Sequence, residues 1–135
     1  MFSSCLFLTN IKHLEKWNVS NGKDFISLFE SCEKLTDIKA LENWDVSNGN
    51  NFSLMFRNCS SLSDISTLEK WNVSNVTNFS SMFYKCSSLS NIKSIEKCDI
   101  SKGDRFYSIF NDCWSSLDKR PLEKWKHLNK KFSFY

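Results

Sequence analysis

The hydrophobic positions of this chain recur with a step of 27 residues, as from Trp44 to Trp71. Three residue types keep this step along the chain: Trp17, Trp44, Trp71 and Trp125; Cys5, Cys32, Cys59, Cys86 and Cys113; Phe2, Phe29, Phe56, Phe83 and Phe110. Periods of 20–50 residues are typical of arrays of stacked structural repeats. The pattern therefore predicts one repetitive array, in which each unit packs only against its neighbours.

The second half of the unit has the spacing of a short helix. In the third copy the apolar residues lie three or four positions apart: Val76, Phe79, Met82, Phe83, Cys86 and Leu89. This spacing predicts one apolar helical face, and Ser74, Asn75 and Asn78 offer side-chain oxygens to the free N–H groups at its start. Such a helix is too short to be stable alone, so packing against neighbouring units must hold it.

The first half of the unit predicts extended structure. Leu62 and Ile65 form a short strand core, and Trp71 and Val73 alternate with polar residues in a second extended segment. We therefore predict an α/β fold: a right-handed solenoid of the leucine-rich-repeat type, with about five partial units, each with a short strand, an extended segment and a short helix. Residues 1–125 form the array, and residues 126–135 form a basic and aromatic tail or an improvised cap. Phe132, Phe134 and Tyr135 are expected to fold back over the last unit.

One stretch carries a specific resemblance. The sequence WNVSNVTNFSSMFYKCSSL at 71–89 resembles the unit of BspA-like leucine-rich-repeat surface proteins, and the likeness extends over residues 1–125. The chain departs from that unit at Gly22, Gly49 and Gly103, where the third copy has Val76, and at Cys98, which stands in place of a tryptophan. These departures predict local loosening. The resemblance implies display on a cell surface and adhesion to host or neighbouring cells, and it implies no particular binding residue.

Composition limits the classes of partner. The chain has 135 residues, 41% of them hydrophobic and 24% charged, which suits one packed domain. A net charge of +3 is too small to indicate a nucleic-acid partner, and we expect none. No run of 18 apolar residues occurs, so we expect no membrane span. The start of the chain, residues 1–8, fits the repeat register and lacks the basic region of a signal peptide. With no address or anchor recognised, the localisation stays unknown, although the resemblance suggests the cell surface or the extracellular space.

The cysteine and aromatic ladders are best interpreted as core. No C-x-x-C pair occurs, so we interpret each ladder cysteine as a small buried thiol beside a phenylalanine, with disulfides or a metal site as the alternatives. The aromatic ladders could serve as stacking platforms for bases or sugars, but their place in the apolar pattern indicates the interior. Six N-x-S/T sequons occur, as an Asn- and Ser-rich repeat produces in any case: Asn18, Asn51, Asn58, Asn72, Asn75 and Asn78.

Little in the chain indicates catalysis. His13 and His127 do not recur with the repeat, and neither a glycine-rich phosphate loop nor a paired-carboxylate motif occurs. We therefore expect a protein that is not an enzyme, with no catalytic residues, no metal and no cofactor. The basic tail (Arg120, Lys124, Lys126, Lys130 and Lys131) is interpreted as a solvated end rather than a membrane or nucleic-acid patch.

The candidate binding surface is the polar side of the predicted strands. Its residues flank the buried leucines and isoleucines of three units: Thr36, Asp37, Lys39, Ser63, Asp64, Ser66, Ser90, Asn91 and Lys93. In a stack they would form parallel polar ribbons, which make extended binding surfaces. We expect a non-catalytic module that binds a protein or a cell-surface glycan. The alternatives are a merely solvated face, a structural module that associates end to end through exposed apolar ends, or an intracellular interaction scaffold.

Overall fold

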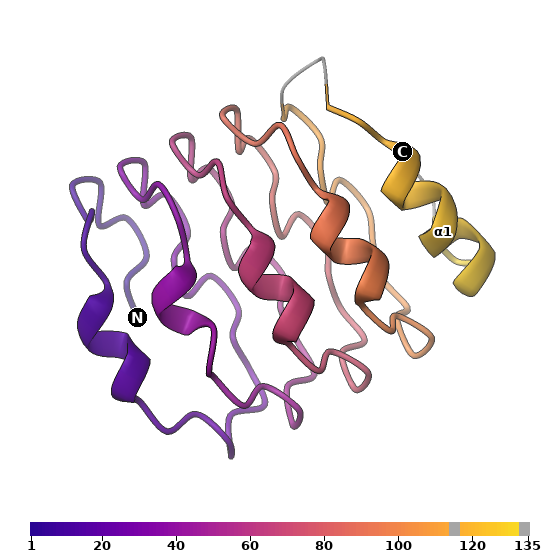
Figure 1. Ribbon diagram of the computed structural model, residues 1–135, viewed down its shortest axis with the longest axis horizontal. Helices are drawn as coiled ribbons and strands as arrows, with labels where there is room; N and C mark the ends of the chain where they lie inside the picture. Colours follow the sequence, from indigo (N-terminus) through magenta and orange to yellow (C-terminus); the bar gives the residue numbers. More distant parts are fainter. Residues whose placement is uncertain (114–116, 133–135) are drawn as a thin grey trace.

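The units stand side by side in a row (Figure 1). The computed structural model describes residues 1–113 and 117–132. Each unit contributes one helix, and the helices begin 27 residues apart: the 3₁₀ helices η1 (Lys12–Lys16), η2 (Lys39–Leu41), η3 (Ser66–Lys70) and η4 (Lys93–Lys97), and the α-helix α1 (Arg120–Leu128). They lie along one side of the row, which we call the helix face. The N-terminus lies at one end of the row and α1 at the other.

The α/β leucine-rich-repeat solenoid predicted from the sequence is wrong. The described residues contain no β-strand and no sheet, and their β-structure is limited to isolated parallel bridges between neighbouring units, such as Asp37–Asp64. The helix predicted over residues 76–89 is absent, because that region is a series of turns. The segment predicted as a strand around Ile65 leads directly into the 3₁₀ helix η3. Within the described part of the chain, α1 is the only α-helix.

Backbone conformation explains why the turn segment, residues 79–86 and their equivalents, is not a helix. Ser81 and Lys85 have φ values of 54° and 59°, in the left-handed region, whereas an α-helix needs negative φ at every residue. The Met82 N–H donates to the Phe79 carbonyl at 3.2 Å, and the Cys86 N–H donates to the Phe83 carbonyl at 3.2 Å. These bonds span three residues, as in β-turns, so successive turns reproduce the three- and four-residue spacing of a helix face.

The other N–H groups of the turn segment bind the next unit. The N–H groups of Phe79, Ser81 and Phe83 donate to carbonyls 26 positions ahead, those of Arg105, Tyr107 and Ile109, at 2.8, 3.0 and 2.9 Å. The same register recurs at the other junctions, for example from Phe2 to Leu28 at 2.9 Å. Backbone donors are thereby satisfied alternately within a turn and between units, without a β-sheet.

Two aromatic rows fill the interior. The first is a column of stacked rings, Phe2, Phe29, Phe56, Phe83 and Phe110, with successive centroids 5.4–5.6 Å apart. Phe29 and Phe56 have no exposed surface, which confirms that the phenylalanine ladder belongs to the core. The second row is made of rings in contact with one another: Phe25, Phe52, Phe79, Phe106, Trp44, Trp71 and Trp125. Trp44 and Trp71 are each 4% exposed, whereas Trp17 in the first unit is 43% exposed.

The tryptophans also bind the preceding unit. Their indole N–H groups donate to carbonyls 30 positions earlier: Trp44 to Leu14 at 2.7 Å, Trp71 to Leu41 at 3.0 Å and Trp125 to Ile95 at 2.9 Å. Cys98 stands in a tryptophan position, and its thiol faces the equivalent carbonyl of Leu68 at 3.6 Å. The substitution of cysteine for tryptophan therefore keeps a weak version of the same contact.

All five ladder cysteines are free thiols, and three of them are buried as predicted, whereas Cys113 is only partly buried. Cys32, Cys59 and Cys86 have no exposed surface, and Cys59 donates to the Phe29 carbonyl at 3.1 Å. Equivalent bonds 30 positions back are made by Cys32, Cys86 and Cys113. Cys5 is an exception, since its side chain is exposed.

The three glycines each lie against a phenylalanine ring of the core, at Phe25, Phe52 and Phe106. A Cβ atom on Gly49 would lie 2.5 Å from the Phe52 ring and 2.9 Å from the Val46 carbonyl oxygen. The missing side chain thus leaves the room that the phenylalanine ring occupies.

The last unit is closed by α1 and the residues after it. The helix buries Pro121, Leu122 and Trp125, and it crosses the boundary that we drew between residues 125 and 126. Phe132 is 4% exposed and packs edge-on against Phe106, with centroids 5.3 Å apart, which confirms that it folds back over the last unit. Phe134 and Tyr135 lie outside the described residues.

Candidate binding grooves

All nine predicted binding residues are exposed on the helix face, at or just before the start of a helix. Thr36, Asp37 and Lys39 precede or begin η2; Ser63, Asp64 and Ser66 do so at η3; Ser90, Asn91 and Lys93 do so at η4. Because no strands form, these residues do not line strands. They instead form rows across the starts of the helices.

Three of the nine have a structural role that the sequence reading missed. A side-chain oxygen accepts a hydrogen bond from the N–H two residues on: Asp37 from Lys39 at 3.0 Å, Asp64 from Ser66 at 2.8 Å and Asn91 from Lys93 at 2.9 Å. Asn10 and Asp118 do the same before η1 and α1. These are Asx turns, and they orient the chain into each helix. The recurrence of Asn or Asp at this one position of the repeat was the available signal.

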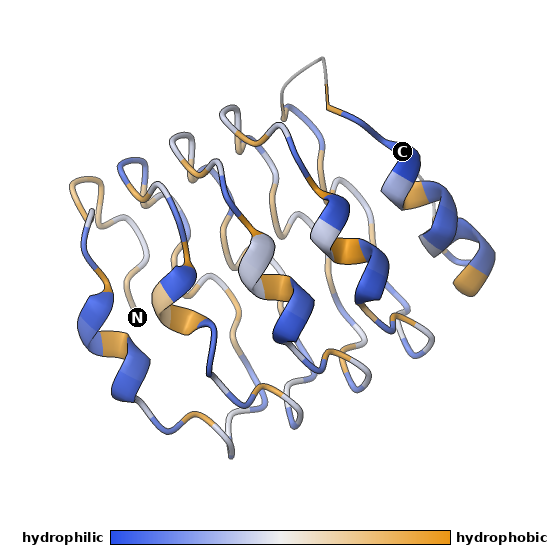
Figure 2. Cartoon of the chain, viewed as in Figure 1, coloured by the Kyte–Doolittle hydropathy of each residue, from blue (hydrophilic) through white to orange (hydrophobic). Residues whose placement is uncertain are grey.

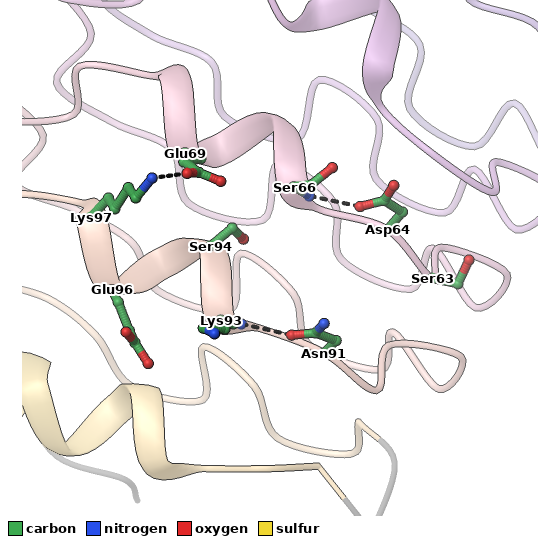
Figure 3. A pocket seen from close by; sticks show the side chains of 9 residues that line it. All are labelled: Ser63, Asp64, Ser66, Glu69, Asn91, Lys93, Ser94, Glu96 and Lys97. Carbon is green, nitrogen blue, oxygen red and sulfur yellow. Dashed lines mark hydrogen bonds and ion pairs between the residues drawn. The ribbon is translucent and has the colours of Figure 1, made fainter.

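Grooves lie between three pairs of consecutive helices. The largest, which we call the central groove, lies between η3 and η4 and has a volume of about 760 Å³ (Figure 3). It is lined by Ser63, Asp64, Ser66, Glu69, Asn91, Lys93, Ser94, Glu96 and Lys97. Five of the predicted residues therefore meet here. Grooves of about 340 and 480 Å³ lie between η1 and η2 and between η4 and α1; the first contains Asp37 and Lys39, and the second contains Ser90. Thr36 lines none of these three.

The central groove also contains charged residues that the sequence reading missed. Glutamate recurs with the period at 15, 42, 69, 96 and 123, and lysine follows it at 16, 70, 97 and 124. Lys97 pairs with Glu69 across the groove, and Lys70 pairs with Glu42 of the preceding helix at 2.6 Å. The hydrogen bond from Lys70 lowers the pKa of Glu42. Exposed ion pairs of this kind contribute little to the free energy of unfolding. Their main effect is to set where positive and negative side chains lie on the helix face.

The chemistry of the central groove is polar and mixed in charge. Carboxylates, ammonium groups, hydroxyls and an amide line it, and no aromatic side chain does. Hydrophilic residues cover most of η1, η3, η4 and α1, with an apolar band turned to the core by residues such as Leu14 and Ile95 (Figure 2). The described residues contain no group of three or more histidine, cysteine or acidic side chains that could hold a metal ion. Burial raises the pKa of Cys59 to about 12, so this thiol is a poor nucleophile near neutral pH.

The described helices include none with the length and apolar character needed to cross a membrane.

Comparison with known proteins gives one match. The family described as "Mycoplasma protein of unknown function, DUF285" matches residues 1–125. The chain belongs to this family. The match is consistent with the resemblance to BspA-like proteins and covers the residues that carry that resemblance. No curated protein and no solved structure matches the chain. In this member of the DUF285 family, the residues described beyond the match include the end of α1 and Phe132, which close the last unit.

Proposed function

We propose that this chain is a non-catalytic binding module that holds another protein along its helix face. The observation that supports this proposal is the central groove, where exposed side chains of both charges from two adjacent units line one hollow of about 760 Å³. Electrostatic complementarity with a partner's charged side chains gives specificity at such a surface. The polar lining and the absence of aromatic side chains from it favour a protein partner over an apolar small molecule.

The backbone beneath the central groove suits binding because hydrogen bonds and core packing within the protein fix its position. Asp64 and Asn91 fix the starts of the two helices through their Asx turns, and Leu68 and Ile95 anchor the helices in the core. A backbone that is already ordered loses less conformational entropy when a partner binds. The family resemblance adds the expectation that the module is displayed on a cell surface and adheres to host or neighbouring cells.

The test compares two single lysine reversals. In the first variant, Lys93→Glu, the replaced lysine lies in the central groove. In the second, Lys34→Glu, it lies in an exposed turn away from the described grooves. We expect the labelled chain to bind saturably to intact cultured animal cells, and we expect mild protease treatment of the cells to abolish this binding. Lys93→Glu should weaken binding about tenfold, or about 1.4 kcal/mol, and Lys34→Glu should leave it within twofold.

Equal losses in the two variants would contradict a role for the groove. Binding that survives the protease but disappears after glycosidase treatment would point to a cell-surface glycan as the partner. No saturable binding to any cell type tested would refute adhesion.

A further inference from the structure

The first residue of the described helices is basic in four units and neutral in one. The four basic residues are Lys12, Lys39, Lys93 and Arg120, whereas η3 begins with Ser66. Each of the two smaller grooves is lined by two of these basic side chains, but the central groove is lined by only one, Lys93. The central groove has a volume of about 760 Å³, against about 340 and 480 Å³ for the others. A positive side chain is therefore missing from the groove that has the most room.

The missing side chain leaves one carboxylate without a basic neighbour. Among the aspartates that form Asx turns before the described helices, only Asp64 lacks a basic residue two positions on. Asp64 is exposed, and its Oδ1 accepts the Ser66 N–H at 2.8 Å. Its Oδ2 accepts no hydrogen bond and forms no ion pair with any residue that the structure describes. Asp64 therefore offers the central groove a negative charge with a free acceptor.

The last unit shows how a guanidinium binds at this position. Asp118 and Arg120 lie two periods after Asp64 and Ser66. The Arg120 Nε donates to Asp118 Oδ1 at 2.9 Å, and Nη2 donates to Oδ2 at 2.6 Å. Asp118 Oδ1 also accepts the Arg120 N–H at 3.0 Å, so one carboxylate serves the Asx turn and a bidentate guanidinium together. The hydrogen bonds from the Arg120 side chain lower the pKa of Asp118 to about 2.

The other charges of the central groove leave Asp64 open. Glu69 and Lys97 pair with each other, away from Asp64, and Glu96 points from η4 toward α1 (Figure 3). Lys93 lies on the η4 side of the groove and makes no ion pair with a described carboxylate. A guanidinium for Asp64 must therefore come from another molecule. A partner of mixed charge can place a carboxylate at Lys93 at the same time.

We propose that Asp64 binds an arginine side chain of the partner protein, in the room that Ser66 leaves in the central groove. The contact copies the pair of Arg120 with Asp118. Arginine suits this position better than lysine, because its planar guanidinium donates to both oxygens of one carboxylate, whereas an ammonium is a point charge. This inference rests on the function proposed above and specifies it, since it names the group of the partner that the groove recognises.

The first test examines the arginine site without a partner protein. The probe is acetyl-arginine amide, and the control ligand is acetyl-citrulline amide, which has a similar shape and no charge. In NMR titrations the arginine probe should shift the backbone amide signals of Ser66 and Asn91 and bind roughly fivefold or more tightly than citrulline. Asp64→Asn keeps the oxygen of the Asx turn but removes the charge, so it should abolish this preference. Equal binding of the two ligands to the wild type, or an unchanged preference in Asp64→Asn, would overturn the proposal.

A variant that fills the site from within gives an independent check. Ser66→Arg should fold as the wild type does, because the same arrangement exists at Arg120 and Asp118. It should lower the pKa of Asp64, measured by NMR, and prevent the probe from binding. Ser66→Ala leaves the room open and should bind the probe within about twofold of the wild type. Wild-type affinity in Ser66→Arg would contradict the proposed site.

The second test asks whether the partner uses an arginine. In the cell-binding assay, Asp64→Asn and Ser66→Arg should each weaken binding about tenfold, and Ser66→Ala should leave it within about twofold. Treating the cells beforehand with phenylglyoxal, which modifies arginine, should weaken binding of the wild-type chain more than acetylation of cell-surface lysines does. If Lys93→Glu weakens binding but these variants and phenylglyoxal do not, the arginine proposal is overturned and the proposed function stands. If the chain binds no cells, the proposed function fails, and the NMR titration alone decides whether Asp64 takes an arginine.

Discussion

At the scale of single residues, the unusual feature is left-handed backbone at positions that are not glycine. Nine of the described residues have φ between 52° and 62°: Ser4, Ser27, Ser31, Leu54, Asn58, Ser81, Lys85, Ser108 and Asp112. Such a conformation costs roughly 1–2 kcal/mol for an ordinary L-residue, and less for Asn or Asp. Seven of them, Ser81 and Lys85 included, donate their own N–H groups to carbonyls of the next unit, so the inter-unit hydrogen bonds hold this backbone in place. Leu54 and Lys85 carry the conformation with the least suitable side chains.

Lys85→Gly should therefore stabilise the protein. Glycine removes the steric cost of the left-handed conformation but loses more backbone entropy on folding, so the net gain should be about 0.5–1 kcal/mol. The control is Lys93→Gly, at an exposed helical position, which should lose about 0.5–1 kcal/mol. Urea denaturation of the two variants gives both values, and a loss for Lys85→Gly would contradict the strain argument.

At the scale of elements, the Asx turn before each helix is the unit of local order. Its acceptor is Asn or Asp interchangeably, as Asn91 and Asp64 show at equivalent positions. The shared requirement is a side-chain oxygen at the right distance, not a charge.

Substitutions of Asp64 should separate the effect of its side-chain oxygen from the effect of its charge. Asp64→Asn keeps the oxygen and should change the free energy of unfolding by less than about 0.5 kcal/mol, whereas Asp64→Ala should lose about 1 kcal/mol, the usual contribution of a hydrogen bond. Thr36→Ala, at a nearby exposed position with no side-chain hydrogen bond to a described residue, serves as the control and should be near neutral. Thermal or urea unfolding measures all three. An Asp64→Ala variant as stable as the wild type would show that the turn forms without its side-chain acceptor.

The elements were also where prediction from the sequence failed. The spacing of Phe79, Met82, Phe83 and Cys86 identified the buried side chains correctly, and all four are at most 3% exposed. That spacing could not distinguish a helix from successive turns, since both return the chain inward every three or four residues. The sign of φ at Ser81 and Lys85 decides between them, and hydrophobicity does not report it. The same limit applies to Ile65, which was assigned to a strand although it leads into a 3₁₀ helix.

At the scale of the whole molecule, burial of the thiols along the stack couples stability to pH. Burial raises the pKa of Cys32 and Cys113 to about 11, and of Cys59 and Cys98 to about 12, from an ordinary value of 9.0. Burial also raises the pKa of Cys86. Above pH 9 the unfolded chain loses these protons while the folded chain keeps them. The thiol contribution is therefore complete below pH 9 and is lost as the pH rises towards 11–12.

We expect an alkaline loss of stability that Cys59→Ala reduces. Each buried thiol should contribute about 1.4 kcal/mol of lost stability for each pH unit between the unfolded and folded pKa values. Urea denaturation at pH 9.5 and 10.5 gives the loss of unfolding free energy per pH unit. This loss should be smaller for Cys59→Ala than for the wild type by about that amount, although the variant is less stable at pH 7. Cys5→Ala, at an exposed position, is the control. Identical slopes for Cys59→Ala and the wild type would refute the link between thiol burial and alkaline unfolding.

The candidate site could be predicted from the sequence only in part, and the reason also belongs to this scale. The polar residues at 63, 64, 66, 91 and 93 were recognised because they flank buried residues in each unit, and they do line the central groove. Glu69 and Lys97 were missed because they meet only across the junction between two units. A groove made by neighbours becomes visible once the stacking register is known.

Backbone N–H groups of one unit donate to carbonyls 26 positions ahead, and this fixed spacing limits how a gene for such a protein can change length. Inserting a single codon within a turn segment would place the N–H of Phe79 opposite the wrong carbonyl, and the error would extend along that junction. Duplicating a whole unit would instead recreate every ring contact, thiol contact and carbonyl contact already present. Unequal recombination between copies is therefore a tolerated route of variation, while small frame-preserving insertions are confined to the tips of the loops.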